Sequence, residues 1–162
     1  MNKQSWKSLA AILDTLLVNQ EYKEKMIDGT NGYSGAYFIS KKPMSTSITD
    51  YLDKIQKHAK CSDSCYIVAY IYLQKLLAEY PSFTLNKLNI SKLTLAAIIL
   101  AIKYTEDSYV DNEDYAGVGE VSLEELNEAE VELLELLDFK LNVTPDDIRN
   151  AIENLSNTKR LC

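Results

Sequence analysis

The segment from Leu93 to Ile102 is apolar at every position except one threonine. It reads Leu-Thr-Leu-Ala-Ala-Ile-Ile-Leu-Ala-Ile, which is about half the length that a membrane-spanning helix requires. A helix that is apolar on every side has to be surrounded by other elements of the same protein. The sequence therefore predicts a central buried helix that begins near Asn89.

The neighbouring segments have the apolar spacing of helices, and none shows the alternation typical of strands. Apolar residues recur at intervals of three and four from Ile48 to Ala59, behind a capping pattern of Ser47 and Asp50. Further helices are predicted at 63–79, 112–116 and 123–138, and from Pro145 onward. The helix predicted at 63–79 carries Tyr66, Tyr70 and Tyr72, which we expect to pack partly in the core with their hydroxyls reaching water. The fold class is all-α.

A polar run rich in glycine divides the chain. Three of the five glycines lie within residues 29–35, a composition typical of a linker. We expect four parts: an N-terminal helix at 1–28, a linker at 29–44, a compact helical domain at 45–141, and a C-terminal helix and tail at 142–162. The N-terminal helix has one apolar face, formed by Trp6, Leu9, Leu13, Leu16 and Leu17.

The charge of the chain limits the partners that it can have. Its formal net charge is −7, whereas nonspecific nucleic-acid binding needs a basic surface that displaces counterions. The first residues lack the pattern of a secretory signal, and no apolar segment is long enough to span a bilayer. We therefore expect no nucleic-acid or membrane partner and a location in the cytoplasm, the nucleus or both.

Cysteine is sparse, with three residues in the chain. An odd number without a secretory signal is typical of a reducing, intracellular environment. Cys61 and Cys65 are four positions apart, so they would share one face of a helix. With only His58 nearby, they lack the second pair of ligands that a zinc site needs. The sequence predicts no metal site.

One charged residue falls on the apolar side of the predicted helix from Leu123 to Asp138. At about 100° per residue, five leucines fall within one arc of roughly 100°, the stripe expected to face the core: Leu123, Leu126, Leu133, Leu134 and Leu137. Five glutamates fall on the opposite side: Glu124, Glu125, Glu128, Glu132 and Glu135. Glu130 lies near the middle of the apolar arc. Because a desolvated carboxylate is costly unless it is paired, Glu130 is predicted to have a partner.

Lys103 is the candidate partner of Glu130, because it is the only charged residue between Leu93 and Tyr104. It lies at the end of the central helix, and we expect the two side chains to lie together on one surface patch. Two interpretations stay open. The pair is either a salt bridge that only holds the bundle together, or part of an apolar stripe that continues into an interface with a partner.

Three short motifs are candidates for catalytic or ligand-binding sites, but each lacks residues that such a site requires. Gly117-Val-Gly119 follows no predicted strand and lacks the spacing and lysine of a phosphate-binding loop. Asp111-Asn-Glu-Asp114 lacks the alternating ligands and the final glutamate of a calcium loop. His58 has no serine or cysteine partner at a spacing that supports nucleophilic catalysis. We therefore predict no catalytic residue, cofactor or small-molecule ligand, and a protein that is not an enzyme in its own right.

Several ordered fragments resemble the cyclin box of the P-type (phosphate-pathway) cyclins of yeast and the related U-type cyclins of plants and protists. Each fragment is short, but their order and spacing between Pro43 and Val143 are specific. The fragments are Pro43 with Ser47-Ile-Thr-Asp-Tyr-Leu-Asp-Lys-Ile55, Cys65 with Ala69-Tyr-Ile-Tyr-Leu73, Asn89-Ile-Ser-Lys-Leu93 with Ala101-Ile-Lys103 and Glu106-Asp107, Asn112 with Tyr115-Ala-Gly-Val-Gly119, and Leu126-Asn127 with Glu130 and Leu137-Asp-Phe139-Lys-Leu141.

The chain departs from the pattern of this family at three places. Ser91-Lys92 stands where the family usually has His-Arg, and Gln74-Lys75 stands where Asp-Arg is common. Glu120 replaces the second glycine of a Val-Gly-Gly step. The first two departures fall on internal polar contacts of the cyclin box, and the third falls in a loop near the expected partner.

The resemblance implies a single cyclin box, a five-helix bundle with an extra N-terminal helix and a C-terminal helix. It also implies a regulatory subunit that binds and activates a cyclin-dependent protein kinase by moving the regulatory helix of the kinase inward. Lys103 and Glu130 would then bind the kinase backbone. Apolar contacts around them would come from Tyr104, Leu134, Phe139 and Leu141, and the N-terminal helix with Trp6 would lie across the kinase. The alternative is a cyclin-fold adaptor or scaffold that does not activate a kinase.

Overall fold

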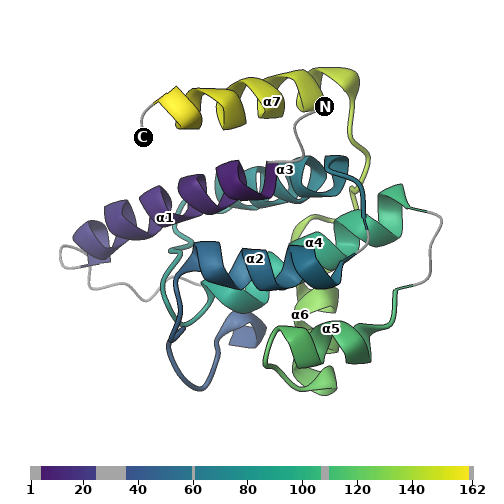
Figure 1. The fold of residues 1–162 in the computed structure, drawn as a ribbon. Helices are drawn as coiled ribbons and strands as arrows, with labels where there is room; N and C mark the ends of the chain where they lie inside the picture. Colours follow the sequence, from purple (N-terminus) through teal and green to yellow (C-terminus); the bar gives the residue numbers. More distant parts are fainter. Residues whose placement is uncertain (1–4, 25–35, 60, 107–109, 161–162) are drawn as a thin grey trace.

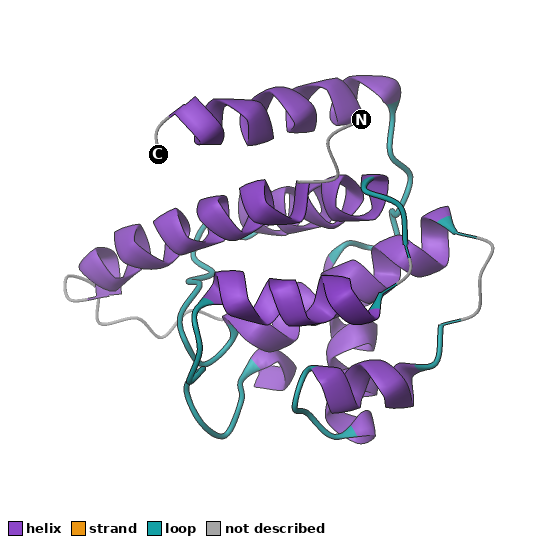
Figure 2. Ribbon diagram, in the orientation of Figure 1, coloured by secondary structure: helices purple, strands orange, loops and turns teal. Residues whose placement is uncertain are grey.

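The computed structural model describes residues 5–24, 36–59, 61–106 and 110–160, and the regular elements in these ranges are all helices (Figures 1 and 2). In chain order they are α1 (Ser5–Glu24), the short 3-10 helix η1 (Ala36–Phe38), α2 (Ile48–His58), α3 (Ser64–Glu79), α4 (Ile90–Thr105), α5 (Asn112–Val118), α6 (Leu123–Leu136) and α7 (Pro145–Arg160). The predicted all-α class is confirmed. None of the helices in the described ranges has both the length and the apolar character that a membrane span requires.

The predicted central helix is α4. Every residue from Ile90 to Ile102 is buried, and α4 packs against α3, α6 and η1. Helices α2 to α6 form the expected five-helix bundle around it (Figure 1).

Capping side chains fix where the helices begin. Ser47 Oγ accepts a hydrogen bond from the Asp50 N–H at the start of α2. Ser122 and Glu125 form a complete capping box at the start of α6, as their spacing predicts. Pro145 occupies the first position of α7, where its missing N–H leaves no bond unmade.

The N-terminal helix is an integral layer of the fold. α1 packs against α2, α3 and α7, and α7 lies along it at the top of Figure 1. Its predicted apolar face is buried, including Trp6, Leu9, Leu13 and Leu17. Other helices of this chain therefore cover the apolar face of α1, including Trp6, that was expected to lie across a partner. Of the linker predicted at 29–44, residues 29–35 lie outside the described ranges, and η1 lies in the rest.

The expectation for the tyrosines of α3 was wrong for Tyr66, whose hydroxyl is buried, and for Tyr72. The side chain of Tyr72 is fully buried, and its hydroxyl donates to the Leu141 carbonyl oxygen at 3.0 Å. The hydroxyl satisfies a backbone acceptor of the α6–α7 connection rather than reaching water, because this connection folds back over α3.

Glu132 was expected on the polar side of α6, and this expectation was also wrong. Only 5% of Glu132 is exposed. Helix η1 covers this side of α6, and Glu132 Oε2 accepts the Tyr37 N–H at 2.9 Å. Ile39, the residue after η1, is also held in place: the buried Lys92 donates from Nζ to its carbonyl oxygen at 3.0 Å. Helical periodicity could not indicate this burial, because the covering segment lies far away in the sequence.

Candidate functional site

The end of α4 and the middle of α6 bring Lys103 and Glu130 together. Lys103 lies in the last turn of α4, Glu130 lies in the middle of α6, and Lys103 Nζ donates to Glu130 Oε1 at 2.7 Å. The lysine side chain is 39% exposed and the glutamate side chain is 12% exposed. The predicted pairing is confirmed, and one partner of the pair is open to solvent.

A third residue, Asn112, completes the pair. Asn112 Nδ2 donates to Glu130 Oε2 at 2.7 Å and to Asn127 Oδ1 at 2.9 Å. Both oxygens of Glu130 are therefore hydrogen-bonded, which lowers the cost of burying the carboxylate. The sequence pattern alone did not indicate this role of Asn112. The available signal was that a buried carboxylate has two oxygens, and a single lysine satisfies only one of them well.

This group of side chains retains hydrogen-bonding capacity for another molecule. An ammonium group has three donors, and within the described residues the recorded bond of Lys103 is the one to Glu130. Asn112 Oδ1 is buried and has no hydrogen-bond partner in the described part of the chain. Both residues line a shallow cleft of about 510 Å³ together with Val110, Leu123 and Asn127. The exposed ammonium group of Lys103 is therefore suited to donate to backbone carbonyl oxygens of a partner.

The four predicted apolar residues lie at the ends of α4 and α6. Tyr104 is 48% exposed and Phe139 is 66% exposed, while Leu134 and Leu141 are half-buried. Burial, and after it the nearby Tyr104 hydroxyl, raises the pKa of Tyr72, the residue that holds Leu141. Val131, which follows Glu130, is a further exposed apolar residue, at 52%. The sequence pattern did not indicate it as part of the apolar surface, because its position on α6 lies beyond the apolar arc.

The backbone at the end of α6 has an uncommon conformation. Asp138 has a φ of 53° and Phe139 a φ of 57°, values that residues with a Cβ rarely adopt. The Phe139 N–H donates to the Leu134 carbonyl oxygen at 2.9 Å, a bond typical of a helix that ends in a left-handed residue. Strained backbone that presents an exposed aromatic ring is a feature of binding surfaces.

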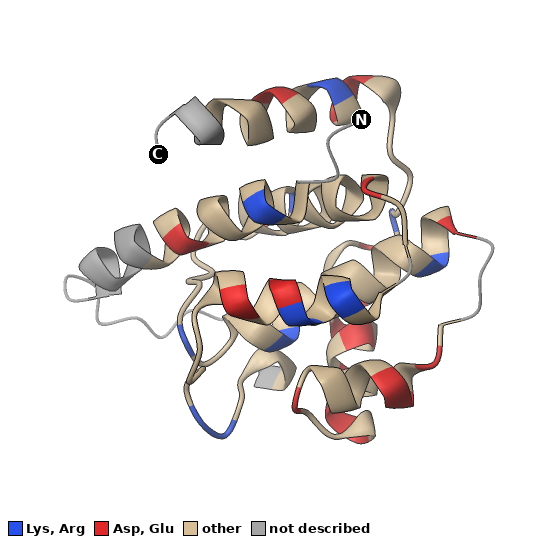
Figure 3. Cartoon of the chain, viewed as in Figure 1, with Lys and Arg blue, Asp and Glu red and all other residues tan. Residues whose placement is uncertain are grey.

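Helices α5 and α6 carry acidic residues and neither lysine nor arginine (Figure 3). Asp111 and Glu113 line the same cleft as Lys103. In Figure 3 the basic residues lie on loops and on the other helices, most of which also carry acidic residues, so α5 and α6 stand out as purely acidic.

Cys61 lies just before α3, and Cys65 lies in its first turn. Cys65 is buried, and its thiol donates to Glu106 Oε1 at 3.3 Å. The same carboxylate oxygen accepts from the Ser62 N–H at 3.1 Å. In the described part of the chain, no three histidine, cysteine or acidic side chains are grouped so that they could hold a metal ion. Cys65 therefore serves to join the end of α4 to the start of α3.

Glu120 occupies a position that favours glycine. Its φ is 57°, in the left-handed region where a Cβ adds strain. The preceding Gly119 is needed for another reason, because a Cβ there would lie 2.4 Å from Leu95 Cδ2. Glu120 is the departure from the Val-Gly-Gly step noted in the sequence, and its carboxylate pairs with Lys54 Nζ at 3.3 Å.

Comparison with known proteins gives one consistent result. The family model for cyclins matches residues 13–141. Among curated relatives, cyclin-U4-3 of Arabidopsis thaliana is 34% identical over 155 residues, which cover 93% of this chain and 71% of that protein. Cyclin-U3-1 of the same plant is 40% identical, with coverage of 81% and 58%. Cyclin-P4-1 of Oryza sativa subsp. japonica is 41% identical, with coverage of 61% and 47%. The chain thus spans between about half and seven tenths of the length of these relatives.

Proposed function

This chain belongs to the cyclin family, among the U- and P-type cyclins, and on that premise we propose that it is a regulatory subunit that binds and activates a cyclin-dependent protein kinase. The observation that carries the proposal is the hydrogen-bonded group of Lys103, Glu130 and Asn112, which we call the Lys103–Glu130 corner. Its carboxylate is almost buried and fully hydrogen-bonded, while its lysine stays exposed between a cleft and an apolar rim.

Preorganised charges of this kind suit the recognition of a backbone. Asn112 and Glu130 hold Lys103 in place before any partner binds, so less side-chain entropy is lost on association. The exposed rings of Tyr104 and Phe139 add apolar area at the rim, and aromatic residues are enriched where binding energy concentrates.

In the proposed complex, this face docks on the small lobe of the kinase and holds its regulatory helix in the inward position. The catalytic lysine of the kinase then pairs with the glutamate of that helix, and the activation loop becomes ordered. The contribution of this chain is positional, because every reacting group belongs to the kinase.

The test measures binding and activity together. Purified cyclin-dependent kinases are mixed with the wild-type chain, and co-elution, dissociation constant and peptide phosphorylation are recorded. We expect at least one kinase to bind and to gain activity. Glu130→Ala should weaken binding by roughly 10- to 100-fold, because hydrogen bonds to charged groups contribute about 1.5–3 kcal/mol.

The matched control is Glu128→Ala, which removes the same group from an exposed position of α6 and should leave binding unchanged. Binding without any gain in kinase activity would instead favour the adaptor. No binding to any kinase in the set would contradict the proposal.

A further inference from the structure

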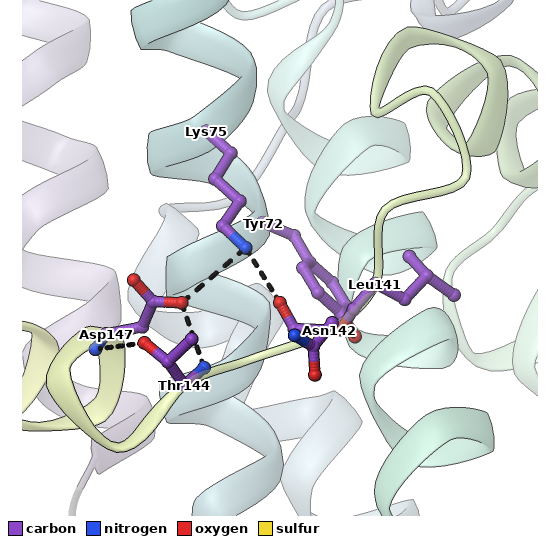
Figure 4. Close-up of polar contacts among 6 residues, drawn as sticks. All are labelled: Tyr72, Lys75, Leu141, Asn142, Thr144 and Asp147. Carbon is purple, nitrogen blue, oxygen red and sulfur yellow. Dashed lines mark hydrogen bonds and ion pairs between the residues drawn. The ribbon is translucent and has the colours of Figure 1, made fainter.

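The connection between α6 and α7 is tied to α3 by three side chains. The Tyr80 hydroxyl donates to the Leu136 carbonyl oxygen at 3.3 Å, and the Tyr72 hydroxyl donates to the Leu141 carbonyl oxygen at 3.0 Å. Lys75 Nζ donates to the Asn142 carbonyl oxygen at 3.0 Å. Figure 4 shows Tyr72 and Lys75 reaching from the same helix toward consecutive residues of this connection. The anchor therefore acts on backbone atoms rather than on side chains.

This anchored segment is also the one that carries the exposed apolar residues. Phe139 lies between the anchored carbonyls of Leu136 and Leu141, and it has a left-handed backbone with 66% of its surface exposed. A strained conformation persists only where surrounding structure holds it. The bonds from α3 flank the strained residues on both sides, so they are suited to that task.

Lys75 also joins this connection to α7. Its ammonium group lies 3.7 Å from Asp147 Oδ2. Asp147 accepts the Thr144 N–H at 3.0 Å and donates its own N–H to Thr144 Oγ1 at 3.1 Å, which closes a capping box at the start of α7. Hydrogen bonds from Thr144, with smaller contributions from Lys75, lower the pKa of Asp147, so it is charged at neutral pH.

We propose that Lys75 and Tyr72 are positioning residues for the docking surface, holding the backbone of Leu141 and Asn142 so that Phe139 faces the kinase. This inference rests on the proposed function and adds residues of α3 that do not themselves lie on the docking face. Lys75 is one of the departures from the family pattern, where arginine is common. Arginine at this position would keep the charge and the donors.

A purely structural role for Lys75 predicts something different. If Lys75 only stabilised the fold, Lys75→Met would lower the melting temperature, and any remaining loss of binding would be independent of Phe139. If Lys75 positions Phe139, its effect on binding depends on that ring being present. Coupling of this kind is measured by a double-mutant cycle.

The experiment uses the full chain and a kinase that the wild type binds. Lys75→Met keeps the aliphatic stem and should weaken binding by roughly five- to tenfold, less than the loss of a charge-assisted hydrogen bond made directly to the partner, because Lys75 acts through the backbone that it holds. In a Phe139→Ala background, the same substitution should weaken binding by less than about twofold. In a Lys103→Ala background, it should keep its full effect, because Lys103 lies on another element. Lys75→Arg should restore binding.

Each outcome bears on the inference separately. Equal losses in the wild-type and Phe139→Ala backgrounds would overturn it, and so would unchanged binding by Lys75→Met. If Lys75→Met does not fold, as judged by circular dichroism, Tyr72→Phe replaces it in the same cycle. A wild-type chain that binds no kinase would overturn the proposed function, and the docking role of Lys75 with it.

Discussion

Glu130 and Glu132 lie two residues apart on α6, and both are nearly buried, at 9% and 5% exposed. Glu130 is bonded to the side chains of Lys103 and Asn112 beside an open cleft. Glu132 accepts a backbone N–H from η1, which covers it. A buried carboxylate therefore does not mark a functional site by itself. What distinguishes Glu130 is that its partner Lys103 is partly exposed and still has donors available to another molecule.

The first prediction would break this comparison by removing the structural carboxylate. Glu132→Ala leaves the partly buried Tyr37 N–H without its acceptor and removes a buried side chain, which should lower the free energy of unfolding by about 1–3 kcal/mol. Urea denaturation followed by circular dichroism measures the change. Glu132→Gln keeps an oxygen acceptor and should recover most of the stability. An alanine variant as stable as the wild type would show that the Tyr37 bond contributes nothing.

The second prediction changes the functional carboxylate without deleting it. Asn112→Asp would place a second carboxylate against Glu130, 2.7 Å from the oxygen that now accepts a donor. Two carboxylates in contact raise one pKa strongly. Kinase affinity should fall by about tenfold at neutral pH and recover as the pH is lowered, because the pair then binds a proton and regains a hydrogen bond. Affinities measured across this range test the prediction, with the wild type as the flat reference. A loss independent of pH would mean that Asn112 does not act through Glu130.

The third prediction concerns the strained backbone of Glu120 in the connection between α5 and α6. Glu120→Gly removes the cost of a Cβ at a φ of 57° and loses only an exposed ion pair with Lys54. Since the left-handed region costs about 1–2 kcal/mol for residues other than glycine and exposed pairs contribute little, the variant should be more stable by about 1 kcal/mol. Thermal unfolding measures the gain, and a lower melting temperature would contradict it.

The smallest expected effect is the acid dependence at Asp147. Hydrogen bonds from Thr144 lower its folded pKa, so its contribution to stability is complete above the pKa of a free aspartate. That contribution is lost as the pH falls through the lower folded pKa. The difference in stability between the wild type and Asp147→Asn should be constant near neutral pH and should shrink below about pH 4. Denaturation curves at several pH values test this, and a constant difference down to strong acid would refute it.

Periodicity accounts for what could be read from the sequence. The run from Leu93 to Ile102 indicated the central helix, and the position of Glu130 in an apolar arc led to Lys103, because both signals depend only on helix geometry. The burial of Glu132 and the bonds of Tyr72 and Lys75 depend on η1 and on the α6–α7 connection. These segments have no period, and their backbone acceptors are the same for every residue type, so no sequence signal placed them.

The most direct test compares the two carboxylates in one experiment. Kinase dissociation constants and unfolding free energies are measured side by side for the wild type, Glu130→Ala and Glu132→Ala, at a temperature where all three are folded. We expect Glu130→Ala to lose kinase affinity with the smaller loss of stability, and Glu132→Ala to lose stability while its folded fraction binds as the wild type does. If Glu130→Ala loses as much stability as Glu132→Ala and keeps its affinity, then the Lys103–Glu130 corner is structural and the proposed docking face is wrong.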